Sequence, residues 1–191
     1  MEINTPDKPK ALILHGWDDD PTVGWLGWLG YELQARDWQV VSPNFVTHQG
    51  RPDMQTWMEQ LEEAAGQLNS NSIVIAHSLG CWLALRMLEN FEATKSIAAG
   101  YLVAGFYDAP RPEASKFFSP EPNWVQLKEV CPSWNCILSQ DDLIVTPDRT
   151  ERLALKLGAD VVRLEEYGHF LGSRGMARFP QLLDLILSQT K

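Results

Sequence analysis

The chain has 191 residues, of which 45% are hydrophobic and 21% are charged. This length suits a single domain spanning 1–191 with a sizeable core, and the composition excludes a disordered chain, a collagen-like repeat and a coiled-coil rod. The 16 basic and 25 acidic residues give a formal net charge of −9 without a basic cluster, which argues against nucleic acid or an anionic membrane as a partner.

Six short apolar runs are spread along the chain, and each is bounded by Gly, Pro, Asn or charged residues. Such runs are typical of buried strands in a mostly parallel sheet. We therefore predict strands at 11–14, 39–42, 73–76, 97–104, 135–139 and 161–164.

Helical patterns separate these runs. From Asp53 onward, apolar residues recur at i, i+3 and i+4, and the sequence NSNS at 69–72 ends the segment. Thr146 and Pro147 suit a helix start and Gly158 suits its end, which predicts a helix over 147–157. Further helices are expected at 79–90 and 176–188. The alternation predicts a doubly wound α/β fold with a mostly parallel sheet of about six strands flanked by helices.

Residues 105–133 depart from this alternation. The stretch holds five prolines and several aromatic residues, which disfavours a long regular element. We interpret it as a loop over one rim of the sheet. Trp17 and Trp124 lie on predicted rim loops and are candidates for lining a substrate pocket, whereas Trp25, Trp28, Trp57 and Trp82 fit helix faces and are expected in the core.

The most informative motif lies between the third predicted strand and the helix after it. Ala76-His77-Ser78-Leu79-Gly80 matches the G-x-S-x-G nucleophile elbow, with alanine in the first glycine position. The tight turn lifts the Ser78 hydroxyl above the carboxyl edge of the sheet, where open α/β folds bind ligands. The alternative interpretation is a serine that caps a helix after a core strand.

A serine nucleophile needs a base, and the base needs an orienting carboxylate. The fifth predicted strand ends at Asp141 and Asp142, and the sixth leads into His169. The candidate carboxylate and the candidate base therefore lie at the same sheet edge as Ser78, and serine, aspartate and histidine follow in the chain order that α/β-hydrolases use. The residues alone leave the choice between Asp141 and Asp142 open.

With these motifs, the chain resembles the α/β-hydrolase superfamily, and within it the small serine hydrolases related to retinoblastoma-binding protein 9 and the bacterial YdeN-type proteins. The resemblance covers almost the whole chain, through LHGW (14–17), WLGWLGYEL (25–33), AHSLG (76–80), SQDDLIV (139–145) and GHF (168–170). It implies a compact α/β-hydrolase fold without an inserted lid domain.

The resemblance also implies catalytic roles: Ser78 as nucleophile, Asp142 as orienting acid and His169 as base. Leu143 stands where the family often has a proline after the acid, which weakens the choice of Asp142 over Asp141. His15-Gly16-Trp17 matches the oxyanion loop of the family, so the backbone N–H groups of Trp17 and Leu79 are expected to bind the oxyanion. A plain turn after the strand is the alternative.

The other polar residues near these motifs have simpler interpretations. His77 is expected to pack or to form a local hydrogen bond, because its side chain diverges from that of Ser78. His48 is expected on the surface. Asp18, Asp19 and Asp20 are interpreted as a solvated cap before a proline, with a lesser alternative in which they repel anionic substrates.

The N-terminal sequence MEINTPDKPK lacks the pattern of a secretory signal, and no apolar run approaches the roughly 18 residues of a membrane span. We expect a cytoplasmic protein that does not bind a membrane. The three cysteines, Cys81, Cys131 and Cys136, contain no close C-x-x-C pair and are expected to be buried or incidental thiols. No histidine or cysteine cluster has metal-ligand spacing, so no metal or cofactor is expected.

The sequence thus predicts a metal-independent serine hydrolase, a carboxylesterase that cleaves a small carboxyl ester or related acyl substrate through an acyl-enzyme. One alternative is a hydrolase fold that binds a protein partner, with a vestigial triad. The L-x-C-x-E pattern of retinoblastoma binding does not occur in the chain. Acyl transfer to an acceptor other than water would use the same residues.

Overall fold

The computed structural model describes residues 7–17, 19–46, 51–109 and 117–190. These residues contain one six-stranded sheet in the order β2-β1-β3-β4-β5-β6, and all five neighbouring pairs are parallel. The strands are β1 (Lys10–Leu14), β2 (Gln39–Val41), β3 (Ser72–His77), β4 (Ala99–Val103), β5 (Trp134–Ser139) and β6 (Asp160–Leu164). The predicted doubly wound parallel sheet is confirmed.

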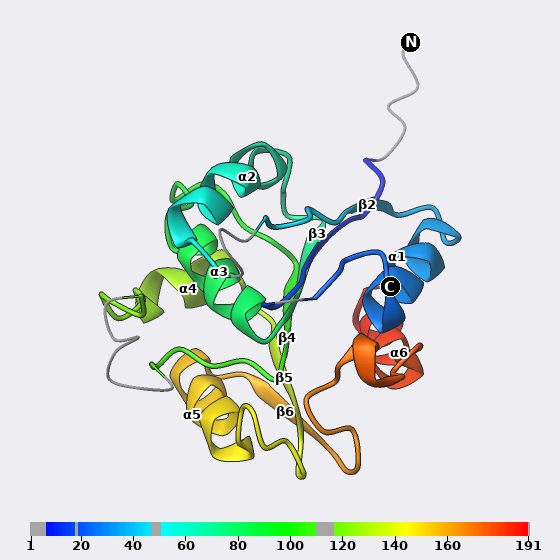
Figure 1. Cartoon of the computed structure of the whole chain (residues 1–191). Helices are drawn as coiled ribbons and strands as arrows, with labels where there is room; N and C mark the ends of the chain where they lie inside the picture. Colours follow the sequence, from blue (N-terminus) through cyan, green and yellow to red (C-terminus); the bar gives the residue numbers. More distant parts are fainter. Residues whose placement is uncertain (1–6, 18, 47–50, 110–116, 191) are drawn as a thin grey trace.

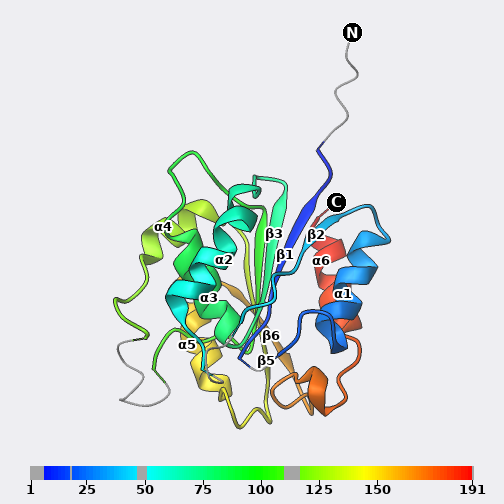
Figure 2. The same ribbon diagram turned by 45° about the horizontal axis from the view of Figure 1, so that its top comes forward.

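Helices cover both faces of this sheet (Figures 1 and 2). One face carries α1 (Gly24–Gln34) and α6 (Pro180–Gln189). The other face carries α2 (Met54–Gly66), α3 (Leu79–Leu88), α4 (Trp124–Val130) and α5 (Pro147–Leu157). A short 3₁₀ turn, η2 (Gly172–Arg174), precedes α6.

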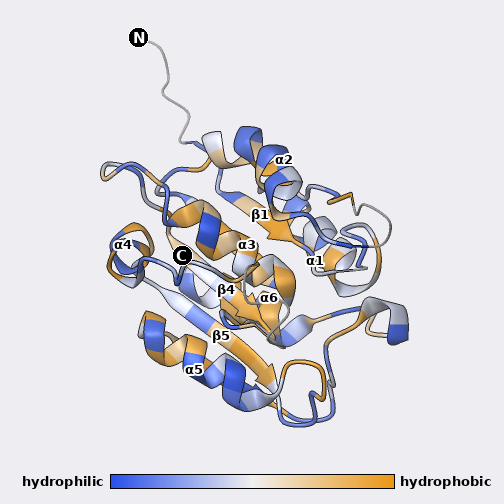
Figure 3. Ribbon diagram, turned by 60° about the vertical axis from the view of Figure 1, so that its left-hand side comes forward, coloured by the Kyte–Doolittle hydropathy of each residue, from blue (hydrophilic) through white to orange (hydrophobic). Residues whose placement is uncertain are grey.

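The sheet is buried because most residues of its central strands are apolar. All residues of β3, β4 and β5 are buried, whereas the edge strands β2 and β6 are half-exposed. Figure 3 shows strands with long hydrophobic stretches between helices that alternate hydrophobic and hydrophilic residues. The aromatic core includes Trp25, Trp57 and Trp82, each at most 1% exposed, while Trp28 is half-buried.

Local sequence signals explain where several helices begin and end. The Asp53 carboxylate accepts a hydrogen bond from the Thr56 N–H at 2.8 Å, which caps the start of α2. Pro147 is the first residue of α5, and Gly158 ends it with a left-handed φ of 70°. Thr146 precedes α5 as predicted, but its side chain makes no capping bond to the helix backbone.

Two predicted elements differ from the structure. The stretch 105–133 was expected to be a loop, yet α4 lies within it, because Asn123 caps a short helix whose Leu127 and Val130 are buried. The helix expected at 176–188 begins only at Pro180, since a proline suits the first helical position but not the helix interior.

Candidate active site

Ser78 occupies the turn between β3 and α3. Its backbone has φ 51° and ψ −119°, a conformation that residues with a side chain rarely adopt. Two hydrogen bonds hold this turn: the Ser78 N–H donates to the Val103 carbonyl at 2.9 Å, and the Cys81 N–H donates to the Ser78 carbonyl at 2.9 Å. The chain therefore reverses from strand to helix at one residue, as in a nucleophile elbow.

Close packing around this turn explains the small residues in the motif. A Cβ atom at Gly80 would lie 2.6 Å from the His15 carbonyl oxygen and 2.7 Å from that of Leu14, so only glycine fits. Ala76 is fully buried in β3, where the structure accommodates its methyl group. The loop after β1 passes equally close, since a Cβ at Gly16 would lie 3.0 Å from the Ser78 Cβ.

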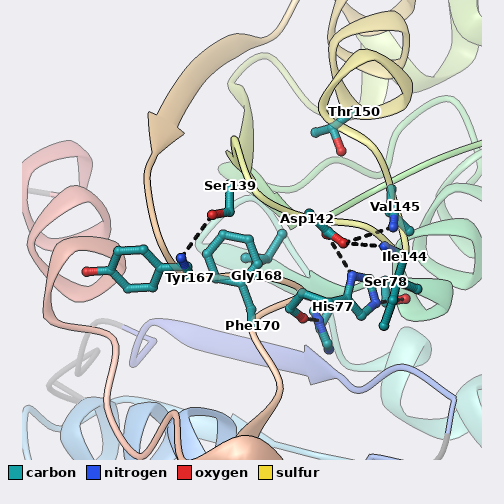
Figure 4. A network of polar contacts seen from close by, with 12 residues as sticks. His77, Ser78, Ser139, Asp142, Ile144, Val145, Thr150, Tyr167, Gly168 and Phe170 are labelled. Atoms are coloured by element: carbon teal, nitrogen blue, oxygen red, sulfur yellow. Dashed lines mark hydrogen bonds and ion pairs between the residues drawn. The ribbon is translucent and has the colours of Figure 1, made fainter.

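Three polar side chains from different elements meet at this turn (Figure 4). His169 Nε2 lies 2.9 Å from Ser78 Oγ, and His169 Nδ1 lies 2.7 Å from Asp142 Oδ2. Because a carboxylate oxygen only accepts, Nδ1 carries the ring proton, which leaves Nε2 free to accept the serine proton. The arrangement has the connectivity of a Ser-His-Asp triad.

Backbone hydrogen bonds fix the Asp142 carboxylate independently of its contact with His169. The residue is only 2% exposed, and its Oδ1 accepts hydrogen bonds from the N–H groups of Ile144 at 2.8 Å and Val145 at 3.0 Å. A buried carboxylate needs such donors, because it has lost its water shell. The remaining oxygen faces His169.

Asp141 points elsewhere. Its Oδ1 accepts a hydrogen bond from Ser139 Oγ at 2.5 Å and another from the Gly168 N–H at 2.9 Å. These two donors, Ser139 foremost, hold the pKa of the Asp141 carboxyl below its usual value. The structure thus brings Asp142, and not Asp141, to the His169 ring.

The loop after β1 is held by a buried histidine. His15 Nε2 accepts a hydrogen bond from the Phe45 N–H at 2.8 Å, so its Nδ1 carries the proton and donates to the Gly16 carbonyl at 2.7 Å. Burial lowers the pKa of His15, which keeps the ring neutral. In the trans Gly16–Trp17 peptide, the Trp17 N–H points away from the carbonyl that His15 binds. Leu79, the other expected oxyanion donor, is the first residue of α3.

His77 packs in the core, as expected, but its hydrogen bonds are long-range and not local. The ring is 1% exposed, and its Nε2 donates to the His169 carbonyl at 2.9 Å, while Nδ1 lies 3.0 Å from Asp19 Oδ2. Asp19 is therefore not a solvated residue, because its carboxylate is 8% exposed and pairs with His77. Asp20 is exposed and caps the turn at Thr22, as expected. Asp18 and His48 lie outside the described residues.

The two tryptophans proposed for the pocket have different positions. Trp17 is 51% exposed and follows Gly16, which lies against Ser78. Trp124 begins α4, and the Asn123 N–H before it donates to Glu89, which ends α3. Ser78 stands at the opposite end of that helix, about 15 Å away at 1.5 Å per residue. The position of Trp124 thus argues against a role in the pocket.

The described part of the chain holds no group of three or more His, Cys, Asp or Glu side chains that could bind a metal ion. All three cysteines are buried and free, as expected. Burial raises the pKa of the Cys131 and Cys136 thiols to about 12. Among the described residues, no helix is both long and apolar enough to cross a membrane.

An open parallel sheet with a serine elbow, a histidine and a buried carboxylate at its carboxyl edge defines an α/β-hydrolase fold of the serine hydrolase type. The chain belongs to the family described as Serine hydrolase, whose family model matches residues 11–188.

Individual relatives agree with this assignment. The chain is 29% identical to YdeN of Bacillus subtilis (strain 168) over 181 residues, which cover 94% of this chain and 95% of YdeN. It is 27% identical to the serine hydrolase RBBP9 of Rattus norvegicus over 168 residues, covering 84% of this chain and 87% of that protein.

Solved structures show the same fold. The crystal structure of the ydeN gene product from B. subtilis superposes with a TM-score of 0.88 at 27% identity, covering 95% of this chain and 98% of that one. A thioesterase domain from the curacin biosynthetic pathway has a TM-score of 0.66 at 16% identity, covering 96% and 92%. The latter likeness concerns the fold alone.

Proposed function

We propose that this serine hydrolase cleaves a small carboxyl ester or related acyl substrate through a covalent acyl-enzyme, with Ser78 as nucleophile, His169 as base and Asp142 as orienting acid. The continuous hydrogen-bonded chain from Ser78 Oγ through His169 to Asp142 carries this proposal. The unprotonated Nε2 faces the serine hydroxyl, which is the tautomer that general-base catalysis requires.

In the first half-reaction, Ser78 Oγ attacks the acyl carbon while His169 Nε2 takes the hydroxyl proton. The tetrahedral intermediate collapses, and the His169 imidazolium gives that proton to the departing alkoxide, which leaves as an alcohol. The Asp142 carboxylate, held by two backbone N–H groups, stabilises the positive ring during this step.

In the second half-reaction, His169 takes a proton from water while the water oxygen bonds to the carbonyl carbon of the Ser78 ester. The Ser78–acyl bond breaks, the acid is released, and the proton returns to Ser78 Oγ. Acyl transfer would differ only in the acceptor, with an alcohol or amine in place of water.

The backbone N–H groups of Trp17 and Leu79 are proposed to bind the oxyanion. The close approach of Gly16 to Ser78 supports the first donor, because an acyl carbonyl attacked by Ser78 would then lie close to the Gly16–Trp17 peptide. The start of α3 supports the second, since the first N–H groups of a helix lack partners within it. Each such donor typically contributes about 3 kcal/mol to the transition state.

Two proteins with the same fold act on esters or thioesters, as their names state, which supports this class of substrate. They are a thioesterase domain from the curacin biosynthetic pathway and an esterase domain from a Rhodothermus marinus protein. Trp17 is exposed and follows Gly16, which lies against Ser78, so its ring could offer the substrate an apolar contact. We therefore propose a small-molecule acyl substrate in a pocket that Trp17 borders.

Labelling with a fluorophosphonate probe tests the nucleophile directly, because only an activated serine reacts. Wild-type protein is expected to be labelled and to hydrolyse p-nitrophenyl acetate, and Ser78→Ala is expected to lose both properties with an unchanged circular dichroism spectrum. Ser173→Ala, at an exposed serine of η2, is the matched control. Unlabelled wild-type protein would favour the binding-module alternative, and product formed on an added alcohol would favour acyl transfer.

A further inference from the structure

The loop that carries His169 has an unusual backbone. It lies between β6 and η2, outside regular secondary structure, and three of its residues have a positive φ: Glu166 (62°), Gly168 (52°) and Phe170 (55°). Two of these residues are not glycine, and a positive φ is unfavourable for them, so their own backbone preferences do not explain the loop conformation. Contacts with other elements have to hold it.

On one side, the end of β5 supplies those contacts. The Tyr167 N–H donates to Ser139 Oγ at 3.0 Å, and the Gly168 N–H donates to Asp141 Oδ1 at 2.9 Å. The Ser139 hydroxyl in turn donates to the same Asp141 oxygen at 2.5 Å. The Asp141 oxygen therefore binds the Gly168 N–H directly and the Tyr167 N–H through the Ser139 hydroxyl (Figure 4 shows the Tyr167–Ser139 bond).

On the other side, buried aromatic donors hold the next two peptides. His77 Nε2 donates to the His169 carbonyl at 2.9 Å, and Trp25 Nε1 donates to the Phe170 carbonyl at 2.8 Å. Both rings are at most 1% exposed and make edge contact with each other at 5.8 Å between centroids. This side is packed into the core, whereas Asp141 is an exposed residue.

From this arrangement we propose that Asp141 is a positioning residue, which fixes the Gly168 peptide so that the His169 ring meets Ser78 and Asp142 together. The inference rests on the proposed triad. The two consecutive aspartates have different roles: Asp142 orients the imidazole ring of His169, and Asp141 holds the Gly168 peptide that precedes it. The lowered pKa of Asp141 is consistent with a carboxylate that accepts two hydrogen bonds in this position.

Substitution of Asp141 is expected to lower kcat. A misplacement of about 1 Å at a catalytic group can reduce the rate about 100-fold, and the contacts of His77 and Trp25 remain in an Asp141 variant. We therefore expect Asp141→Ala to lower kcat by about tenfold and to change KM by less than about twofold. Asp141→Asn keeps an acceptor oxygen for Gly168 and is expected to lower kcat by only about threefold.

The experiment measures kcat and KM for p-nitrophenyl acetate, the rate of fluorophosphonate labelling of Ser78, and the thermal unfolding midpoint. Asp148→Ala is the matched control, because Asp148 is also an exposed aspartate that accepts hydrogen bonds, from Thr146 and Arg152, but lies in α5. Its kcat and its labelling rate are expected to match those of wild-type protein.

A labelling rate that falls with kcat in Asp141→Ala, and recovers in part in Asp141→Asn, would support the positioning role. A kcat equal to that of Asp148→Ala, or a change in KM alone, would overturn it while leaving the triad intact. If Asp141→Ala does not fold, Asp141→Asn decides the matter, and an unchanged kcat there overturns the inference. Wild-type protein that is not labelled would instead reject the proposed function on which the inference rests.

Discussion

The turn at Ser78 and the loop that carries His169 both contain residues with a rare backbone conformation, but different contacts stabilise them. Ser78 and three residues of the histidine loop all have a positive φ. The serine turn joins a buried strand to a buried helix within one residue, and it is held by backbone hydrogen bonds, from the Ser78 N–H to the Val103 carbonyl of β4 and from the Cys81 N–H to the Ser78 carbonyl. The histidine loop is held by side chains from β5, β3 and α1, which are far away in the chain.

This difference indicates which substitutions would disturb each part of the site. A residue held in a rare backbone conformation costs about 1–3 kcal/mol, which the surroundings have to offset. At Ser78 the offset comes from the sheet and helix themselves. At His169 it comes from individual hydrogen bonds, so single side-chain changes there are expected to affect catalysis more than stability.

The largest expected effect concerns Asp142, the aspartate that we propose orients the His169 ring. Asp142→Asn is expected to lower kcat by about 10⁴-fold, because the amide no longer selects the tautomer in which Nε2 accepts the serine proton. Steady-state hydrolysis of p-nitrophenyl acetate measures this, with Asp141→Asn as the comparison. A larger loss in Asp141→Asn than in Asp142→Asn would transfer the orienting role.

A second prediction tests the stability of the elbow. Gly80→Ala is expected to reduce the free energy of unfolding by about 1–3 kcal/mol, because its Cβ would lie 2.6 Å from a backbone carbonyl oxygen. Gly66→Ala is the control, since nothing lies within 4 Å of a Cβ there. Urea denaturation compares the two, and equal stabilities would mean that the elbow relaxes freely.

A third prediction concerns pH. Burial lowers the folded-state pKa of His15 below its unfolded value of about 6.5. The unfolded chain therefore binds the proton more readily, so this contribution to stability is complete above about pH 6.5 and is lost as the pH falls towards the folded-state value. Thermal unfolding at pH 7.5 and 5.5 is expected to show a smaller pH-dependent loss in His15→Asn than in wild-type protein. Equal losses would contradict the assignment of a neutral ring.

The smallest expected effect separates the two candidate pocket tryptophans. Trp17→Ala is expected to raise KM by a few fold, because Trp17 is exposed next to Gly16, which lies against Ser78, and an aromatic contact with substrate contributes about 1 kcal/mol. Trp124→Ala is expected to leave KM unchanged, since Trp124 packs against Tyr107 and donates to Glu121 beyond the far end of α3. A rise in KM only in Trp124→Ala would reverse this distinction.

Much of the fold was predictable because parallel strands and amphipathic helices have periods that are visible in the sequence. The observed strands Gln39–Val41 and Trp134–Ser139 and the helix Pro147–Leu157 agree with the predicted ranges to within a residue. The helix α4 was missed because it is seven residues long and lies among prolines, so its few buried residues do not form a clear pattern.

The sequence by itself determined the elbow around Ser78, since a strand, a tight turn and a helix follow one another without interruption. It also determined that Asp142 and His169 lie at the same edge, because parallel strands end together. Only the tertiary structure decided which aspartate meets the ring, that Asp19 pairs with His77, and that the histidine loop is anchored from three elements. Such contacts join residues that are distant in the chain, and the direction of each side chain depends on how the whole sheet and its loops pack.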